Sequence, residues 1–393
     1  MSESIERRPM GRTGDRSSIL GFGCMRLPLS GDGRDQIDLD LAQAMVRSAI
    51  DRGVDYVDTA WPYHSAAGIA EPGASEPFLA RALRDGYRER VKLATKLPSW
   101  CVGSRADMDR ILDAQLRRLD TARIDYYLVH GLGRSAWGNL KNHGLLGFLD
   151  EAVKDGRILY PSFSFHDEYP VFEEIVKGYD WAMAMVQYNW LDRRFQAGSA
   201  GVDLAHSRGL AVVVMEPLRG GYLVRHLPDG VREILNRARP GWSYAGWAFN
   251  WLWSRPGVSV VLSGMSDTAQ VDENVALARA YRPGLFTAAD GEAVDAALEW
   301  LGSRSKAACT ACGYCMPCSS GVDIPKNLEL LNQYHLFDAE EARQRSRDFY
   351  RMLVQEYGKA SLCSSCSECV EKCPQGLPVP ALLEEAAGIF CTA

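Results

Sequence analysis

The stretch Val54–His64, VDYVDTAWPYH, joins a strand-like run to polar side chains at its end, and it decides the fold. Its apolar run ends at Asp58, and a helix-like stretch with an apolar face, SEPFLARALRD, follows over Ser75–Asp85. Near-continuous apolar runs of this kind are typical of parallel strands covered by helices on both faces. The same strand–helix unit recurs along the chain from about residue 17 to residue 280.

Eight strand-like runs alternate with eight helix-like stretches in roughly 260 residues, and this pattern predicts a (β/α)8 TIM barrel. A doubly wound open sheet is the alternative. That fold usually carries a glycine-rich fingerprint after its first strand, and GFGCMR at Gly21–Arg26 is not one. We expect the barrel to span residues 1–285, with the polar lead at Arg7–Ser18 forming a hairpin that closes its bottom.

The composition argues against several classes of protein. The chain has 393 residues, of which 47% are hydrophobic and 24% charged, and its net charge of −6 offers no basic field for nucleic acid. Its longest apolar runs, such as Ala245–Trp253, are too short to cross a bilayer, and its N-terminus lacks the apolar region of a signal peptide. We therefore expect a cytoplasmic protein with no nucleic-acid or membrane partner.

Four acid–base side chains follow three consecutive strand-like runs, where a barrel of this type carries its chemistry. They are Asp58 and Tyr63 after the second run, Lys96 in the third, and His130 at the end of the fourth. A lysine near a tyrosine favours the phenolate and lowers the phenol pKa, and a carboxylate can hold that lysine in place. The tyrosine can then act as general acid or base toward a carbonyl or an alcohol. Each residue alone also has a structural interpretation, but together they point to catalysis.

Further blocks follow in order along the predicted barrel: GFGCMRLP, DTAWPYH, SEPFLARAL, ATK, IDYYLVH, FSFH, VQYNWLD, MEPLRGG and SGMSDTAQVDEN. Together with the four strand-end residues, these blocks resemble the aldo/keto reductase superfamily. The resemblance implies a carbonyl reductase or alcohol dehydrogenase in which Tyr63 is the proton donor. In that family's arrangement, Lys96 and Asp58 would tune the tyrosine, and His130 would orient the carbonyl.

The resemblance also implies a nicotinamide cofactor, NADP(H) or NAD(H). The chain departs from many family members after the seventh strand-like run, where Met215 and Glu216 stand in place of an aromatic residue that stacks on the nicotinamide. A basic residue for a 2′-phosphate is not evident in SDTAQVDEN, so the choice between NADP and NAD stays open. The positions assigned to this cofactor are Met25, Ser164, Gln187, Glu216, Leu218, Gly220, Gly264, Ser266, Gln270 and Asn274.

Aromatic residues near the strand ends suggest a pocket for a ring-containing substrate, although ordinary loop packing explains them equally well. The stretch Tyr63–Glu76 is longer than the usual link in the family and could form part of the substrate rim. His166, at the end of the fifth run, could also face the pocket. The aromatic residues in question are Trp61, Trp100, Trp137 and Trp190.

Eight of the 11 cysteines lie in two tight runs, Cys309–Cys318 and Cys363–Cys373. The second run has the C-x2-C-x2-C-x3-C-P spacing of bacterial ferredoxins, which favours iron–sulfur ligation. The first run is one residue shorter before its last cysteine, and Ser319 replaces the proline. Zinc is the main alternative, but its sites usually use paired C-x2-C knuckles.

We expect a linker helix at residues 286–305 and an α-helical ferredoxin-like domain with two [4Fe–4S] clusters at residues 306–393. By analogy with two-cluster ferredoxins, the last cysteine of each run would serve the other cluster. One cluster would then be held by Cys309, Cys312, Cys315 and Cys373, and the other by Cys363, Cys366, Cys369 and Cys318. This extension resembles that of one bacterial branch of aldo/keto reductases.

The leading hypothesis is therefore an NAD(P)H-dependent oxidoreductase acting on a small carbonyl or alcohol. Its clusters would transfer electrons, with a ferredoxin-like donor as partner, or would stabilise the extension. Two alternatives stay open: a non-catalytic electron-transfer subunit, and flavin- or cluster-driven reduction in the same pocket.

Overall fold

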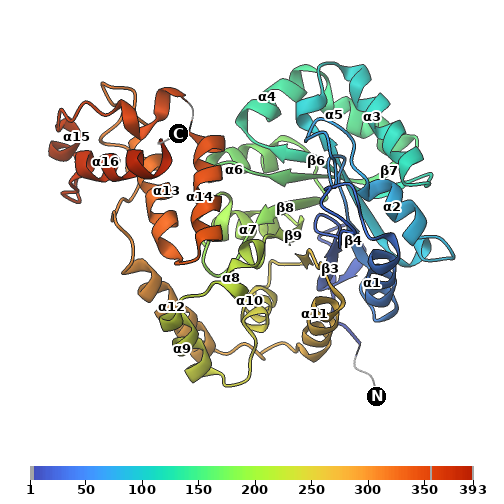
Figure 1. The fold of residues 1–393 in the computed structure, drawn as a ribbon. Helices are drawn as coiled ribbons and strands as arrows, with labels where there is room; N and C mark the ends of the chain where they lie inside the picture. Colours follow the sequence, from blue (N-terminus) through green and yellow to red (C-terminus); the bar gives the residue numbers. More distant parts are fainter. Residues whose placement is uncertain (1–3, 355, 392–393) are drawn as a thin grey trace. The chain divides into compact units, whose positions relative to one another are not determined.

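The computed structural model describes residues 4–354 and 356–391, and its contacts divide the chain into two compact units (Figure 1). The barrel unit comprises Met1–Gly220 and Tyr244–Phe286. The cysteine unit comprises Gly221–Ser243 and Thr287–Ala393. Residues 221–243, which lie inside the range expected for the barrel, thus group with the cysteine-rich part of the chain.

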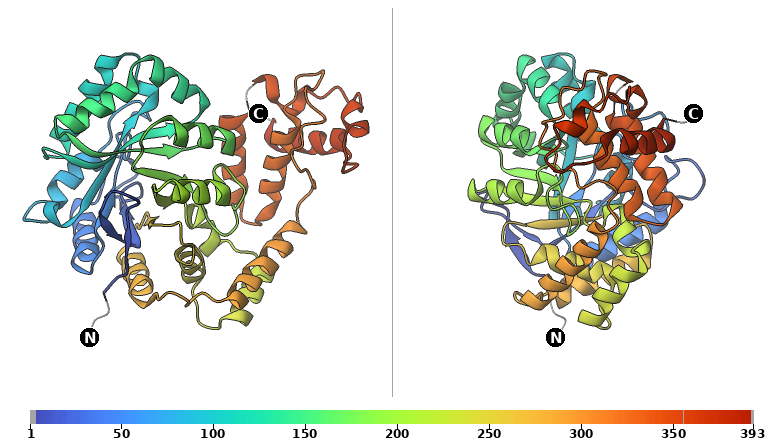
Figure 2. Two further views of the ribbon diagram at one scale, coloured as in Figure 1. Left: turned by 180° about the vertical axis from the view of Figure 1, so that it is seen from behind. Right: turned by 90° about the vertical axis from the view of Figure 1, so that its left-hand side faces the viewer.

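Eight parallel strands close into a barrel, which confirms the predicted (β/α)8 fold (Figures 1 and 2). The ring closes because β10 pairs in parallel with both β9 and β3, and the open doubly wound sheet is therefore excluded. In their order around the barrel, the strands are β10 (Val260–Ser263), β3 (Leu20–Gly23), β4 (Tyr56–Asp58), β5 (Lys92–Pro98), β6 (Ile124–Leu132), β7 (Ile158–Phe165), β8 (Met183–Gln187) and β9 (Ala211–Met215).

Helices connect the strands as the alternating pattern predicts. Several begin at a side chain that accepts a backbone N–H, as Asp38, Ser104 and Asp267 do at the starts of α1, α3 and α11. None of the helices in the described residues is both long and apolar enough to cross a membrane. The barrel helices are α1 (Leu39–Asp51), α2 (Ser75–Ala82), α3 (Arg105–Arg118), α4 (Arg134–Asn142), α5 (Leu145–Lys154), α6 (Tyr169–Gly178), α7 (Gly198–Ser207), α10 (Tyr244–Trp253) and α11 (Thr268–Ala280).

An N-terminal hairpin closes the bottom of the barrel. Its strands, β1 (Arg7–Pro9) and β2 (Arg16–Ser18), pair antiparallel over the range where the hairpin was expected. Met10, at the end of β1, is fully buried and packs in the interior core with residues such as Tyr56 and Tyr126. The interior is thus filled from below by side chains, as is usual for small barrels.

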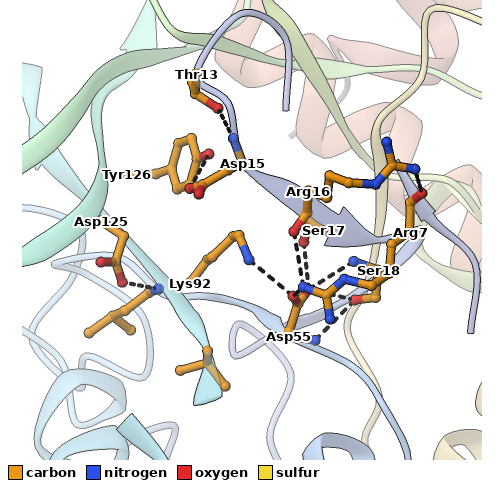
Figure 3. A network of polar contacts seen from close by, with 12 residues as sticks. Arg7, Thr13, Asp15, Arg16, Ser17, Ser18, Asp55, Lys92, Asp125 and Tyr126 are labelled. Carbon is orange, nitrogen blue, oxygen red and sulfur yellow. Dashed lines mark hydrogen bonds and ion pairs between the residues drawn. The ribbon is translucent and has the colours of Figure 1, made fainter. Parts of the chain in front are cut away.

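Asp55, directly before β4, ties this hairpin to the barrel (Figure 3). Its buried carboxylate accepts hydrogen bonds from the Ser17 hydroxyl at 2.7 Å and from the Ser18 N–H at 2.8 Å. Lys92 donates at 3.0 Å, and Arg7 forms an ion pair with the same carboxylate. Burial alone would raise the pKa of Asp55, but these hydrogen bonds and the Lys92 ammonium outweigh it and hold the pKa below its usual value.

The cysteine unit has a small core of its own. Asn327, fully buried on α13, donates to the backbone carbonyls of Asp323 and Gly358 and accepts from Tyr350. Residues 221–243 contact this unit through Arg239, which donates to both carboxylate oxygens of Asp290 at 2.7 and 2.8 Å. The helices of the unit are α8 (Tyr222–Arg225), α9 (Asp229–Ala238), α12 (Ala288–Gly302), α13 (Ile324–Leu336), α14 (Glu340–Leu353), α15 (Glu368–Glu371) and α16 (Val379–Phe390).

We predict that Asp55→Ala destabilises the barrel by about 3 kcal/mol at pH 7, because it leaves buried donors and Lys92 without their acceptor. A carboxylate whose pKa is lowered by folding stabilises the protein above its unfolded pKa of about 4, and that contribution is lost as the pH falls through the folded value. The deficit of the variant should therefore shrink in acid. Urea unfolding followed by tryptophan fluorescence at several pH values measures it.

Asp272→Ala is the matched control, because Asp272 forms only an exposed ion pair with Arg52 on the outside of the barrel. We expect it to change the stability by less than about 0.5 kcal/mol. A deficit in Asp55→Ala that stays constant as the pH falls would contradict the assigned role of the carboxylate.

Candidate active site and cysteine sites

Three of the predicted catalytic residues meet at the carboxyl ends of β4 and β5. Asp58 is the last residue of β4 and pairs with Ala94 of β5, so Lys96 lies two residues further along the same inward face. The Lys96 Nζ donates to both oxygens of Asp58, at 2.7 and 2.8 Å, and to the Tyr63 hydroxyl at 3.2 Å. The Thr59 carbonyl accepts a further hydrogen bond at 2.7 Å.

The electrostatics of this group keep Lys96 charged. Its side chain is only 1% exposed, and burial by itself would lower its pKa. The carboxylate of Asp58 and the hydroxyl of Tyr63 outweigh burial, so the pKa of Lys96 lies above its usual value. A permanently charged ammonium therefore faces the phenol oxygen.

Tyr63 differs from the expectation in one respect. The Lys96 ammonium does lower its pKa, but burial raises the pKa by more and Asp58 adds to the rise. The net pKa of Tyr63 thus lies above its usual value, and the phenol stays protonated at neutral pH. In this state the hydroxyl can give a proton to a bound acceptor, and Lys96 can stabilise the phenolate that is left.

His130 comes from β6 and lies next to Tyr63, with 6.2 Å between the two ring centroids. Burial, Lys96 and His166 hold the pKa of His130 well below its usual value, so the imidazole is neutral. Its Nδ1 is buried, and in the part of the chain that the structure describes it has no hydrogen-bond partner. A neutral imidazole with a spare ring nitrogen suits hydrogen bonding to an uncharged ligand oxygen.

The predicted nicotinamide contacts lie at the ends of further strands. The Ser164 hydroxyl, on β7, accepts from the Gly131 N–H at 2.8 Å, and Gln187, the last residue of β8, donates to Asp192 at 3.2 Å. Glu216 follows β9 with a left-handed backbone (φ 55°), an uncommon conformation for a residue with a side chain. Met25, in the loop after β3, is exposed.

Four of the other positions assigned to the cofactor lie where β10 leads into α11. The Ser266 N–H donates to the Gln270 side-chain oxygen at 3.1 Å, and the Gln270 amide nitrogen donates to the Ser266 hydroxyl at 3.2 Å. Asn274 is buried and donates to Ser263 at 3.0 Å, so part of its amide is engaged within the barrel. Gly264 lies beside Arg26, whose side chain would be 3.4 Å from a Cβ added at this glycine.

Two features of this end of the barrel were missed by the sequence analysis. Arg26 forms an ion pair with Glu216 at 3.0 Å and so connects the loops after β3 and β9. Asp192 accepts hydrogen bonds from Asn189 at 3.1 Å and Arg219 at 3.2 Å, which ties the loop containing Leu218 and Gly220 to the end of β8. The sequence signal that could have pointed to these contacts is the position of polar residues just after strand ends, as in CMR at Cys24–Arg26 and QYN at Gln187–Asn189.

The four tryptophans divide into two groups. Trp137 and Trp190 are 2% and 1% exposed, so they pack in the interior, and Trp61 is buried as well. Trp100, which follows β5, is 42% exposed, and its ring lies 4.9 Å from that of His130. His166 lies close enough to His130 to lower the pKa of His130. The Nδ1 of His166 is in hydrogen-bond contact with Gln196 at 3.3 Å.

In the cysteine unit, the thiols line two hollows. Among residues 4–354 and 356–391, no group of three or more His, Cys, Asp or Glu side chains is arranged to hold a single metal ion. The walls of both hollows combine several thiols with apolar residues such as Ile324. Cys309, Cys312, Cys315 and Cys373 line the first hollow, and Cys315, Cys318, Cys363, Cys366 and Cys369 line the second.

The two cysteine loops share an unusual backbone. Ala311 and Ser365, each two residues after the first cysteine of a run, both adopt left-handed conformations (φ 52° and 56°). Gly313 and Ser367, each four residues after it, do the same (φ 76° and 63°). Turns of this kind point backbone N–H groups toward an anionic group, and the Ala311 N–H lies 3.5 Å from the Cys309 sulfur.

Comparison with known families gives matches to both parts of the chain. The aldo/keto reductase family matches residues 19–283, and a 4Fe–4S dicluster domain matches residues 308–377.

Individual proteins match the barrel. The oxidoreductase YqkF of Bacillus subtilis is 25% identical over an alignment of 309 residues that covers 71% of this chain and 92% of YqkF. An L-glyceraldehyde 3-phosphate reductase of Escherichia coli K12 is 24% identical over 60% of this chain and 78% of its own. The solved structure of aldo-keto reductase AKR11C1 from Bacillus halodurans, in its holo form, superposes with a TM-score of 0.62 at 26% identity, covering 75% of this chain and 96% of that one. For PA4992 of Pseudomonas aeruginosa the TM-score is 0.54 at 27% identity, over 70% and 97% of the two chains.

The buried pair of Lys96 and Asp58 should behave as an energetic unit. Lys96→Met leaves the Asp58 carboxylate buried without a cation and should cost about 3–5 kcal/mol of stability. Adding Asp58→Asn should recover part of this loss, so the double-mutant cycle should give a coupling energy of about 2 kcal/mol. Urea unfolding of the four proteins measures it, and the exposed pair Arg81–Asp40 serves as control. Additive effects at Lys96 and Asp58 would contradict the coupling.

Proposed function

The chain belongs to the aldo/keto reductase family and carries a 4Fe–4S dicluster domain, and from this premise we propose that it interconverts a carbonyl and an alcohol with a nicotinamide cofactor, NADP(H) or NAD(H). The observation that carries the proposal is the hydrogen-bonded set of Asp58, Lys96 and Tyr63 beside the neutral His130.

The residues at the strand ends fit a nicotinamide cofactor. Ser164 and Gln187 would hold its carboxamide, and the loop with Leu218 and Gly220 would hold the pyrophosphate. The position of Ser266 and Gln270, where β10 leads into α11, supports binding at this edge. When bound, the cofactor supplies a hydride to the carbonyl carbon or takes one from the alcohol carbon. The rest of the set, Met25, Glu216, Ser266, Gln270 and Asn274, would complete the site.

The proton chemistry belongs to this chain's own residues. Tyr63, protonated at neutral pH, donates its hydroxyl proton to the substrate oxygen, so the carbonyl becomes an alcohol and the phenol becomes a phenolate. The Lys96 ammonium, 3.2 Å away, stabilises that phenolate until it regains a proton from water. His130 donates a hydrogen bond that orients the substrate oxygen. The reverse sequence describes alcohol oxidation.

The eight clustered cysteines fit two [4Fe–4S] clusters, which supply one-electron transfer when bound. The thiols lining the two hollows support the crossed arrangement, in which Cys373 joins the first three cysteines and Cys318 joins the later three. The partly buried cysteines also pack against the core of the cysteine unit. The clusters would therefore stabilise this unit whether or not they exchange electrons with a ferredoxin-like donor.

We predict that Tyr63→Phe lowers kcat/KM for carbonyl reduction by at least about 100-fold, because the proton donor is lost. The Kd for the nicotinamide cofactor should stay within about two-fold of the wild-type value, because the substitution keeps the aromatic ring. Tyr160→Phe is the matched control, because its hydroxyl lies at the other end of the barrel, 3.4 Å from the Thr13 carbonyl. Stopped-flow absorbance and equilibrium titration measure the two quantities.

An unchanged rate in Tyr63→Phe would refute the catalytic assignment. A wild-type protein that binds neither NADPH nor NADH would favour the alternative of an electron-transfer subunit or of flavin-dependent reduction.

The crossed arrangement predicts the iron content of two double variants. Cys309→Ala/Cys373→Ala removes two ligands of one cluster, so the anaerobically purified protein should keep about four iron atoms per chain. Cys309→Ala/Cys318→Ala removes one ligand from each cluster and should impair both. Iron analysis and the visible absorption spectrum measure the outcome. The opposite result, with four irons kept only in Cys309→Ala/Cys318→Ala, would show that each run holds its own cluster.

A further inference from the structure

The loop at residues 65–72 starts and ends on the backbone next to Tyr63, and we call it the Trp-anchored loop. Ser75 donates its N–H to the Tyr63 carbonyl at 3.2 Å, and Gly73 donates to the Trp61 carbonyl at 2.7 Å. A Cβ at Gly73 would lie 2.0 Å from the Tyr63 carbonyl oxygen, so only glycine permits this close return. The base of the loop is thus built on the backbone that carries the proposed proton donor.

Two indole groups fix the tip of the Trp-anchored loop. Trp100 donates its Nε1–H to the Ile69 carbonyl at 2.9 Å, and Trp61 donates to the Ala70 carbonyl at 3.2 Å. The Cys101 thiol lies 3.4 Å from the same Ala70 oxygen. Three contacts to two successive carbonyls hold the tip against the end of β5.

The anchored tip lies next to the catalytic group. Trp100 connects the two, since its ring contacts that of His130 while its N–H binds the loop. Trp100 is 42% exposed and Ile69 is 67% exposed, so both present apolar surface to solvent in a structure that buries most of its large apolar side chains. An exposed apolar surface beside reactive groups is typical of a ligand site.

The charges around the loop disfavour an anionic ligand. The loop itself contributes the carboxylate Glu71. The pKa of Cys101 is raised mainly by burial and further by the charge of Glu71. Two arginines near it are ion-paired: Arg118 with Glu76 at 2.8 Å, and Arg110 with Asp107 at 2.9 Å. A phosphate group here would therefore meet the Glu71 carboxylate, while Arg118 and Arg110 already have carboxylate partners.

We propose that Ile69 and Trp100 form an apolar clamp that selects an uncharged aromatic or alicyclic carbonyl compound over small and phosphorylated aldehydes. This proposal rests on the proposed function, since it names the substrate class of the same site. Ile69 contacts the ring of the substrate, and the Trp100 N–H acts as a positioning group that holds Ile69 in place.

The first test compares substrates in the wild-type holoprotein, using benzaldehyde, propanal and glyceraldehyde 3-phosphate. We expect kcat/KM for benzaldehyde to exceed that for propanal by about 30-fold, as burial of the additional ring carbons would give. Glyceraldehyde 3-phosphate should be the poorest of the three. A rate for either competitor equal to that for benzaldehyde would overturn the clamp while leaving the proposed carbonyl reductase intact.

Two variants test the separate roles. Ile69→Ala should lower kcat/KM for benzaldehyde by about five-fold and leave propanal within two-fold. Trp100→Phe keeps an aromatic ring but loses the N–H, so it should raise KM for benzaldehyde by about five-fold with kcat unchanged. Leu41→Ala, an exposed leucine on α1, is the matched control and should change neither. Equal effects of Ile69→Ala on both substrates would overturn the selective role.

A binding measurement separates failure of the clamp from failure of the proposed function. Equilibrium dialysis with benzyl alcohol requires no turnover, and Ile69→Ala should weaken binding by about five-fold. If the wild type reduces no carbonyl but this difference in Kd is found, the clamp holds and the proposed reaction fails. If benzyl alcohol binds equally to both proteins, the clamp is refuted whatever the activity.

Discussion

Two lysine–aspartate pairs hold β4 against β5, one at each end of the barrel. Lys92 binds Asp55 at the floor, and Lys96 binds Asp58 at the mouth. Both pairs follow from one register, in which Tyr56 lies beside Lys92 and Asp58 beside Ala94. A slip of one residue would turn both carboxylates away from their lysines. The stability of the floor and the geometry of the proposed proton donor thus depend on the same strand pairing.

Much of this arrangement could be predicted from the sequence, because strand ends carry the polar residues of a (β/α)8 barrel. The pattern indicated the barrel, the hairpin and the positions of Asp58, Tyr63, Lys96 and His130. It could not show the direction of the Tyr63 pKa, which depends on how burial compares with the charge of Lys96. Nor could it separate Trp100 from buried tryptophans, since spacing does not report exposure.

Contacts between distant segments were also beyond the reach of the sequence pattern. Residues 221–243 contain an amphipathic helix whose sequence resembles that of a barrel helix. Their contact with the cysteine unit includes the hydrogen bond from Arg239 to Asp290, which lies 51 residues later in the chain. The pairing of Arg26 with Glu216 joins segments 190 residues apart. The repeated left-handed positions of the two cysteine loops are equally hidden, because alanine, serine and glycine occupy them.

The buried Met10 side chain at the floor of the barrel has a consequence for how molecules and protons reach the interior. In the part of the chain that the structure describes, side chains fill the floor below Tyr63, and Asp55 ties the hairpin to it. In the function that we propose, the proton that restores the Tyr63 phenol therefore arrives by way of the strand-end loops. A ligand bound at those loops would then also control how quickly the proposed proton donor regains its proton, which would couple binding at the mouth to reprotonation of Tyr63.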